Sequence, residues 1–212
     1  MKCMKQKENS PVDELYSILR KRILNEKYSP GEKLSETLLG AEFNCSRTPI
    51  REALKRLERD GLISILPKSG SYVKIHTNQD NKNLMEVRAY IEGLSVRLLI
   101  ENGTSTVPLK KILAEMDTIL KTRPIDIIAF GEKHYEFHFT MVKLSGNDLS
   151  LQVFERLNLR SAMLFYQSMN EKMALKTQIE HKMIIEQIDE GSPKCEKFTI
   201  GHLWKKRNSF AV

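Results

Sequence analysis

The stretch Ser46-Arg47-Thr48-Pro49-Ile50-Arg51-Glu52-Ala53-Leu54 decides the fold of the N-terminal part of this 212-residue chain. Ser46 is a good N-cap, and Pro49 in the first turn sacrifices no intrahelical hydrogen bond. The apolar residues that follow recur at the spacing of one helix face: Ile50, Ala53, Leu54 and Leu57. The stretch therefore predicts a helix with one buried face.

The opposite face of this helix is basic and lies near the positive end of the helix dipole. It carries Arg47, Thr48, Arg51 and Lys55. Arginine can fork onto guanine O6 and N7 or bind a phosphate, and threonine can do either. A lone helix of this kind is more often an amphipathic surface helix with solvated arginines. The surrounding sequence is therefore needed to distinguish a DNA-binding helix from a surface helix.

The residues before this helix predict two more helices. Ser10-Pro11 is a cap-then-proline start, and Tyr28-Ser29-Pro30-Gly31 makes a turn. Ser35 then caps a short helix, and Phe43-Asn44-Cys45 forms a tight connection into the Ser46 helix. This is helix-turn-helix spacing.

The residues after the helix predict a β-hairpin that forms a wing. Gly61 ends the helix, and two strand-like runs, 62–66 and 71–75, flank Pro67-Lys68-Ser69-Gly70. Lys68 at the tip is a candidate contact to a phosphate or a minor groove, although a loop lysine is often simply solvated.

Composition and charge fit a globular protein that binds an acidic partner. The chain is 41% hydrophobic and 29% charged, with a formal net charge of +7. Residues 1–77 hold 15 Lys and Arg against 10 Asp and Glu, so most of the excess lies beside the predicted groove helix. No apolar run approaches the roughly 20 residues that span a bilayer, and the first residues lack the core of a secretory signal. Three widely spaced cysteines indicate free thiols in a reducing cytosol.

Beyond a polar linker at 77–80 the sequence predicts only helices. We expect a disordered tail at 1–9, a winged helix-turn-helix domain at 10–76 and an antiparallel helical bundle at 81–212, which makes the fold mainly α. The first bundle helix, at about 81–102, is expected to bury Leu84, Val87, Ile91, Leu94 and Leu98.

Four of the five histidines lie in this helical region on otherwise apolar helix faces: His134, His138, His181 and His202. Four inward imidazoles from three helices could converge in the bundle core, where helical proteins build metal sites. Neutral imidazole is the commonest protein metal ligand, and the i, i+4 spacing of His134 and His138 suits chelation. A single histidine on an apolar face is more often a hydrogen-bonded core residue, and that alternative stays open.

The N-terminal motifs resemble the winged helix-turn-helix of GntR-family bacterial transcription regulators. They are Leu34-Ser35-Glu36, the Ser46–Leu54 stretch, Arg56-Leu57-Glu58-Arg59-Asp60-Gly61-Leu62 and Gly70-Ser71-Tyr72-Val73. The resemblance implies DNA contacts from Ser46, Arg47, Thr48 and Arg51, with the wing at Lys68 and Gly70 approaching the minor groove. The family often has an arginine after the Glu of Leu-x-Glu, and here that residue is Thr37.

The C-terminal motifs resemble the FCD ligand-binding domain of the FadR-type branch of that family. They are His134-Tyr135-Glu136-Phe137-His138, Leu144-Ser145-Gly146-Asn147, Glu180-His181 and His202. Many members hold a divalent metal with one Asp and three histidines. His138, His181 and His202 match those histidines, and His134 stands at the Asp position.

The resemblance implies a divalent transition metal that helps to bind a small organic acid. An all-nitrogen site would favour zinc, nickel or copper, with zinc or nickel the first expectation. Alternatively, three histidines hold the metal while His134 faces the effector, or the site is metal-free. Arg88 with Glu92 matches the family's R-x-x-x-E pattern, so Arg88 either binds an effector carboxylate or forms a salt bridge at helical spacing.

These expectations describe a bacterial cytoplasmic transcription regulator, by family habit a repressor, without a membrane segment. It would bind a pseudo-palindromic double-stranded operator as a homodimer, under control of a small organic acid. One alternative is a metal sensor, and a weaker one is a metal-dependent enzyme fused to a DNA reader. No phosphate loop, nucleophile elbow or HExxH motif is present, so we expect no enzyme.

Overall fold

The computed structural model describes residues 10–24, 27–157 and 169–207. The chain forms two compact units, Met1–Ile75 and His76–Val212. The predicted tail at 1–9 lies outside the described residues, as do residues 158–168 of the predicted helical bundle. None of the helices in the described ranges has the length and apolar character that crossing a membrane requires.

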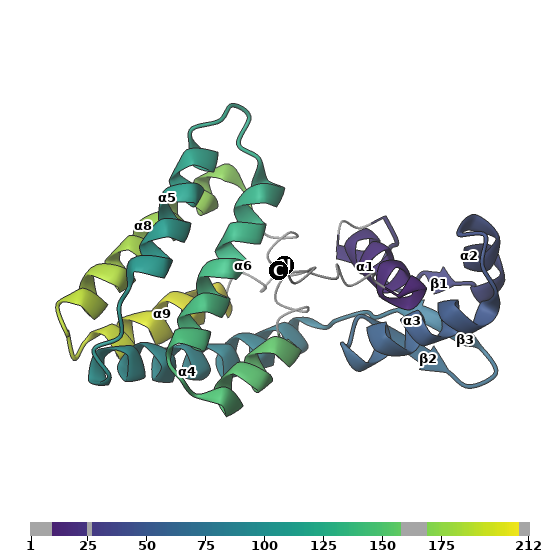
Figure 1. Ribbon diagram of the computed structural model, residues 1–212, viewed down its shortest axis with the longest axis horizontal. Helices are drawn as coiled ribbons and strands as arrows, with labels where there is room; N and C mark the ends of the chain where they lie inside the picture. Colours follow the sequence, from purple (N-terminus) through teal and green to yellow (C-terminus); the bar gives the residue numbers. More distant parts are fainter. Residues whose placement is uncertain (1–9, 25–26, 158–168, 208–212) are drawn as a thin grey trace, which may run out of the picture. The chain divides into compact units, whose positions relative to one another are not determined.

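The first unit is a winged helix-turn-helix, as the sequence predicts (Figure 1). Three helices accompany a three-stranded antiparallel sheet in the order β1-β3-β2. Its elements are α1 (Pro11–Leu24), β1 (Lys33–Leu34), α2 (Glu36–Glu42), α3 (Arg47–Arg59), β2 (Ile63–Leu66) and β3 (Gly70–Val73).

The core of this unit forms where α1 packs against α3. All the apolar positions that the spacing placed on the inner face of α3 are fully buried: Ile50, Ala53, Leu54 and Leu57. A polar contact reinforces the packing, because the Tyr16 hydroxyl donates to Asp60 Oδ2 at 2.6 Å. The Arg56 guanidinium lies over the Tyr16 ring, 4.3 Å from its centroid. The position of α3 is therefore fixed from the side opposite its basic face.

The predicted hairpin is present, with Ile63 opposite Val73 and Leu66 opposite Gly70. Its turn places Lys68 at φ 63° and Gly70 at φ 126°, and the second of these conformations is one that glycine adopts without strain. A short strand, β1, pairs with β3 and was not predicted. It has only two residues, which is too short for an alternating pattern to be recognised.

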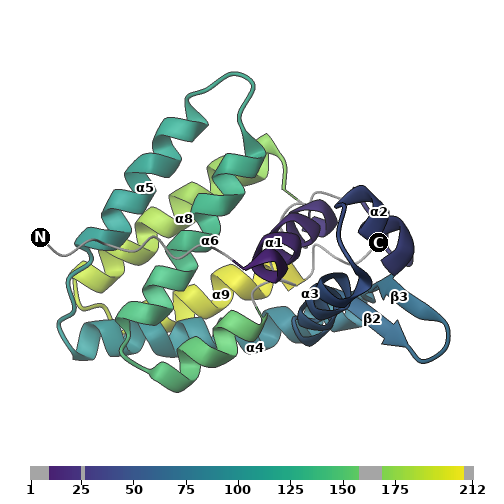
Figure 2. The same cartoon turned by 45° about the vertical axis from the view of Figure 1, so that its right-hand side comes forward.

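The second unit is a helical bundle, as predicted (Figures 1 and 2). Its described helices are α4 (Asn78–Glu101), α5 (Val107–Leu120), α6 (Ile127–Leu144), α8 (Glu171–Asp189) and α9 (Cys195–Arg207), together with helical residues 148–157. Both views show α9 lying along α4 while α5, α6 and α8 stand across them. Gly93 permits the close approach of α4 to α9, since a Cβ there would lie 2.6 Å from Ile200 Cγ1.

Helix α4 begins at Asn78, so residues 77–80 cap and start a helix where we expected a polar linker. Thr77 and Asp80 form a capping box: the Thr77 hydroxyl accepts from the Asp80 backbone N–H at 3.1 Å, and Asp80 Oδ2 accepts from the Thr77 N–H at 3.0 Å. The usual box has Glu or Gln in the second place, and Asp does the same work here.

The buried face of α4 also differs from the predicted one. Leu84 is buried, but Val87 is 47% exposed. The charged pair Arg88 and Glu92 is buried in its place, at 6% and 0% exposure. Apolar spacing alone could not find this face, because its charged side chains become tolerable inside only when they pair with each other.

Candidate functional site

Two sets of residues carry the chemistry that the sequence indicated, one in each unit. The first is the outer face of α3. Arg47, Thr48 and Arg51 are all exposed there, on the side opposite the buried apolar residues. Ser46 has the backbone geometry of an N-cap, with φ −69° and ψ 166°, but its side chain makes no capping hydrogen bond. The face that we assigned to DNA is thus open to solvent.

Arg51 is held by an acidic residue of α2 that the sequence analysis did not single out. Its Nε donates to Glu36 Oε1 at 3.0 Å and one Nη donates to Glu36 Oε2 at 2.8 Å. The hydrogen bonds from Arg51 lower the pKa of Glu36, so the carboxylate stays ionised. Glu36 belongs to the Leu-x-Glu motif that carries the family resemblance, which is the signal that could have found it. Neighbouring Thr37 is exposed.

The wing presents a small polar turn. Lys68 is exposed at its tip, and the Tyr72 and Ser69 hydroxyls lie 2.8 Å apart across the turn. Gly70 has a φ of 126°, a backbone conformation that residues with a side chain rarely adopt, and the atoms nearest to a Cβ there belong to the flexible end of Lys33. A side chain at position 70 would therefore disturb the wing where we predicted a minor-groove contact.

The second set is the group of four predicted histidines, which the bundle brings together. His134 and His138 come from α6, His181 from α8 and His202 from α9. Their exposed fractions are 6%, 0%, 0% and 2%. The ring centroid of His181 lies 5.1 Å from that of His134, 4.9 Å from that of His138 and 5.2 Å from that of His202. Four imidazoles thus meet in the bundle core.

Three of these histidines form a group that could hold a metal ion. One ring nitrogen from each of His134, His138 and His181 lies within 4.8 Å of the others. His138 Nε2 and His134 Nε2 are 3.2 Å apart. The donor set fits a divalent transition ion, because imidazole nitrogen suits zinc, nickel and copper. His202 lies beside this group, with its ring stacked at 6.0 Å from that of His138.

Two carboxylates orient two of the imidazoles. Glu92 Oε2 lies 2.5 Å from His138 Nδ1, and Glu180 Oε2 lies 2.6 Å from His202 Nδ1. An ionised carboxylate only accepts hydrogen bonds, so each Nδ1 must carry the proton. In a neutral ring Nε2 then keeps its lone pair, which is the arrangement that a metal ligand needs.

Glu92 stays ionised although it is completely buried. Burial would raise its pKa, but the charges of Arg88 and His138 and the hydrogen bonds from both outweigh burial and lower the pKa to about 2. Arg88 donates from Nε and one Nη to Glu92 Oε1, at 2.9 and 2.6 Å. The salt bridge that we gave as the alternative for Arg88 is therefore present, and a direct role of Arg88 in binding an effector stays a prediction.

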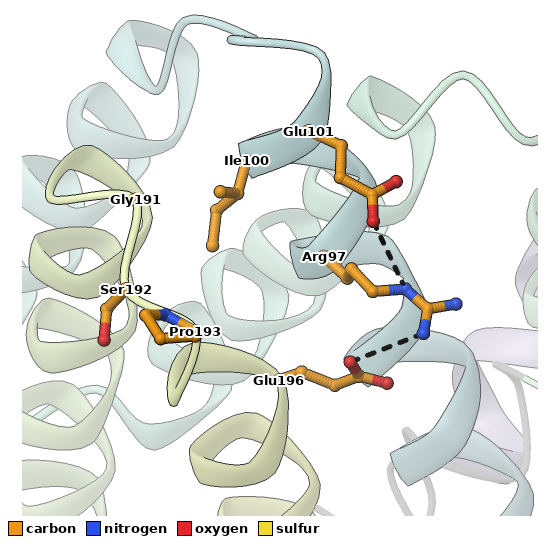
Figure 3. A pocket seen from close by; sticks show the side chains of 7 residues that line it. All are labelled: Arg97, Ile100, Glu101, Gly191, Ser192, Pro193 and Glu196. Carbon is orange, nitrogen blue, oxygen red and sulfur yellow. Dashed lines mark ion pairs between the residues drawn. The ribbon is translucent and has the colours of Figure 1, made fainter.

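A separate pocket of about 290 Å³ opens where the end of α4 meets the turn between α8 and α9 (Figure 3). Its lining includes Arg97, Glu101, Ser192 and Glu196 but none of the four histidines. Arg97 pairs with Glu101 at 3.8 Å and with Glu196 at 3.6 Å. With its arginine engaged by two acidic side chains, this pocket is poorly suited to an anionic ligand.

Comparison with known proteins identifies both units. The sequence model of the gntR family of bacterial regulatory proteins matches residues 11–73, and that of the FCD domain matches residues 83–195. The chain belongs to the GntR family and carries an FCD domain. The resemblance of the N-terminal motifs to the GntR family and that of the C-terminal motifs to the FCD domain are thereby confirmed. The match to a family of regulatory proteins agrees with the expected transcription regulator and not with an enzyme.

Several curated GntR-type regulators resemble the chain. The Nta operon transcriptional regulator of Aminobacter aminovorans is 28% identical over 181 residues, which cover 84% of each protein. The transcriptional repressor RspR of Escherichia coli K12 is 31% identical over 69% of this chain and 65% of its own length. The uncharacterised regulator YdhC of Bacillus subtilis is 32% identical over 68% of this chain and 65% of its own length. The matches to the last two span slightly less than two thirds of those proteins.

Solved structures of GntR regulators share the fold. One from Rhodococcus sp. RHA1 aligns with a TM-score of 0.81 at 19% identity, covering 95% of this chain and 98% of its own. E. coli McbR/YncC aligns with a TM-score of 0.71, also at 19% identity, over 91% of this chain and 94% of its own. At such identities the likeness concerns the architecture, and the chemistry of the site has to be argued from this chain's residues.

Three carboxylates of this GntR protein that are not among the predicted site residues each hold a side chain that is. Glu36 holds Arg51, Glu92 holds His138, and Glu180 holds His202. Each lies inside a motif that the sequence analysis quoted, next to a residue that it named. The cysteines behave as expected: Cys45 and Cys195 are free, burial raises the pKa of Cys195 to about 11, and Cys3 lies outside the described residues.

Proposed function

We propose that this protein is a homodimeric repressor of the bacterial cytoplasm whose affinity for a pseudo-palindromic operator is set by a small organic acid. The acid would bind beside a divalent transition metal held by the histidines of the FCD domain. One observation carries the proposal: four buried imidazoles meet in the bundle core, and carboxylates orient two of them.

DNA reading rests on the exposed face of α3. Arg47, Thr48 and Arg51 would reach base edges or phosphates from the first turns of the helix, and Ser46 would contact the backbone. The wing would add a phosphate or minor-groove contact from Lys68, with Gly70 allowing close approach. One recognition helix reads only one half-site, so a symmetric operator calls for two copies of the chain.

The metal part of the proposal assigns His134, His138 and His181 as ligands, with His202 as a fourth nitrogen beside them. A bound zinc or nickel ion would supply a positive, Lewis-acidic centre for the carboxylate of an organic acid. The protein's own contribution is to hold the imidazoles in a buried site of low dielectric, where charge interactions strengthen. Arg88 binds Glu92 through Nε and one Nη, so its remaining N–H groups could approach a carboxylate without breaking the pair.

Repression is the sign we propose, because two of the similar proteins, RspR and GlaR of E. coli, are named as repressors. An effector can change operator binding only if it binds one state of the protein better than the other. Its effect on the operator Kd therefore measures that difference directly.

Operator binding in the presence of a panel of small carboxylates tests the proposal. We expect at least one acid to change the operator Kd of the metal-loaded protein. The same acid should not change the operator Kd of protein whose metal a chelator has removed. A thermal-shift screen would choose the panel, since a ligand that binds the native state raises the Tm. If acids alter operator binding equally well in protein freed of metal, the metal part of the proposal is wrong.

A second candidate is a regulator for which the ion itself is the signal. It is favoured by the histidine at position 134, because an all-nitrogen group binds a transition ion without help from an organic acid. Adding each metal to the chelated protein, with no acid present, separates the two candidates. A change of operator affinity that follows the metal alone would support the sensor and contradict our first proposal.

A further inference from the structure

We infer that Glu92 and Glu180 are positioning residues of the histidine site, and that the Arg88–Glu92 pair sets which nitrogen of His138 can bind a metal. The inference rests on the proposed metal site and names the residues that prepare it. Neither carboxylate is proposed as a metal ligand, because each bonds Nδ1 of a histidine. Each acts through the imidazole that it holds.

The geometry begins with the two carboxylate–histidine pairs. Glu92 on α4 reaches across to His138 on α6, and Glu180 on α8 reaches across to His202 on α9. Both bonds use Nδ1 of the imidazole, and both involve histidines that are at most 2% exposed. Such outer partners fix the tautomer and the ring orientation of a metal-binding histidine.

The two carboxylates differ in their hydrogen-bond partners and in their burial. Glu92 Oε1 accepts two N–H groups from Arg88, while Oε2 faces His138 Nδ1. The Glu92 side chain is fully buried, and that of Glu180 is 15% exposed. Glu92 is therefore held by a donor on each side away from water, whereas Glu180 is partly open to solvent.

This difference makes Glu92→Gln a sharp test. A glutamine has one carbonyl oxygen and one NH₂ group in place of two equivalent oxygens. Arg88 can only donate, so it would hold the glutamine oxygen and leave the NH₂ facing His138 Nδ1. That nitrogen would then have to accept, which moves the ring proton to Nε2 and blocks the lone pair that points to the other histidines.

Removing the arginine as well should reverse the effect. In the double variant Arg88→Met, Glu92→Gln, the amide is no longer held by a guanidinium. Its oxygen can turn to His138 and restore the Nδ1–H tautomer. A purely structural role of Glu92 predicts the opposite order, because the double variant loses one more hydrogen-bonding side chain than the single variant.

The control is a matched pair on the same helix. Arg97 and Glu101 have the same i, i+4 spacing on α4 as Arg88 and Glu92, and they lie in the exposed pocket lining, away from the histidines. Glu101→Gln makes the same chemical change without touching an imidazole. It should leave the histidine site unaltered.

The first measurement needs no metal. The ¹⁵N chemical shifts of the His138 ring in chelated protein report its tautomer, and we expect Nδ1–H in the wild type and in Glu101→Gln. We expect Nε2–H in Glu92→Gln and a return to Nδ1–H in the double variant. An unchanged Nδ1–H tautomer in Glu92→Gln would overturn the inference, whatever the protein does with metals.

The second measurement is zinc affinity by competition with a chromophoric chelator. Loss of a partner that orients a metal-bound histidine typically weakens binding about 10- to 100-fold. We expect a loss in that range for Glu92→Gln, a smaller loss for Glu180→Gln and recovery in the double variant. Equal affinity of the wild type and Glu92→Gln would also overturn the inference.

Failure of the proposed function looks different. If the wild type binds neither zinc nor nickel, the metal part of that proposal falls, while the tautomer measurement still decides the role of Glu92. Circular dichroism and thermal melting of the chelated variants accompany both measurements. If Glu92→Gln does not fold, the zinc affinities of Glu180→Gln and of the folded double variant still decide the inference. Unaltered zinc affinity in Glu180→Gln would contradict it.

Discussion

The Arg51 guanidinium on α3 and the Glu36 carboxylate on α2 form two parallel hydrogen bonds, of 3.0 and 2.8 Å, on the exposed face of the winged helix-turn-helix. A planar guanidinium has five N–H groups, so two bonds to Glu36 leave others for DNA. Glu36 thereby holds the plane of Arg51 instead of simply cancelling its charge. If Arg51 contacts a base, as we propose, this pair would present the guanidinium in one orientation.

Arg47→Ala and Arg51→Ala should each weaken operator binding by about 1–3 kcal/mol if both arginines contact bases. Arg51→Lys should not restore binding, because an ammonium cannot keep the forked geometry. Fluorescence anisotropy at fixed salt measures the Kd, with Arg59→Ala in the last turn of α3 as the charge-matched control. Unchanged operator affinity in both alanine variants would remove the assignment of this face to DNA.

Tyr16→Phe should lower the free energy of unfolding of the winged helix-turn-helix by about 1 kcal/mol, since it deletes the hydrogen bond to Asp60. Urea unfolding measures this change. The same variant should leave the operator contacts in place, because Tyr16 lies on α1 and faces the buried side of α3. A larger loss of DNA affinity than of stability would contradict that separation.

Stability should also fall in strong base because of Tyr16. Burial, helped by the hydrogen bond and charge of Asp60, raises its pKa from 10.0 to about 12. A folded-state pKa above the unfolded value contributes stability below pH 10, and that contribution is lost as the pH rises from 10 towards 12. The free energies of unfolding of the wild type and of Tyr16→Phe should therefore differ at pH 9 and come closer together at pH 11. An equal difference at both pH values would contradict this role of Tyr16.

Gly93→Ala should destabilise the helical bundle by about 1–3 kcal/mol through overpacking, because its new Cβ would lie 2.6 Å from Ile200 Cγ1. Gly201→Ala is the matched control. It also lies in a helix, and a Cβ there meets nothing within 4 Å. Alanine at 201 should be neutral or add about 0.5–1 kcal/mol, as usual for glycine in a helix. Thermal melting that ranks the two variants the other way would contradict the close approach of α4 and α9.

Metal removal should lower the Tm of the wild type, and zinc or nickel should restore it, since an ion that binds only the native state stabilises that state. Elemental analysis of protein purified without chelator should find a bound transition metal, depleted in His181→Ala. That variant should keep its fold but lose the response of its Tm to chelator. A wild type whose Tm ignores both chelator and metals would refute the metal site.

The sequence predicted the elements whose pattern is local. The Ser46–Leu54 stretch carries its cap, its proline and its apolar spacing within nine residues, and α3 follows that prediction closely. Strand β1 escaped because two residues hold no pattern. The inner face of α4 escaped because apolar spacing favoured Val87, whereas the fold buries the paired charges of Arg88 and Glu92.

The histidines of the site could be predicted from the sequence, but the carboxylates that hold them could not. His134 and His138 show their shared face through one helical turn, and the family resemblance adds His181 and His202. Glu92 lies 46 residues before His138, and no spacing rule joins side chains of different helices across such a distance. Glu180 stands next to His181, yet it serves His202, 22 residues further along the chain.

The Arg88–Glu92 pair also contributes to the net charge around the histidines. Arg88, Glu92 and Glu180 are three ionised side chains that bond the imidazoles or bond their partners. Among these three groups two negative charges face one positive charge, and a neutral imidazole at His134 adds none. A divalent ion would turn this small negative excess into a positive one of equal size. For these three groups and the ion, one further negative charge would then restore electroneutrality.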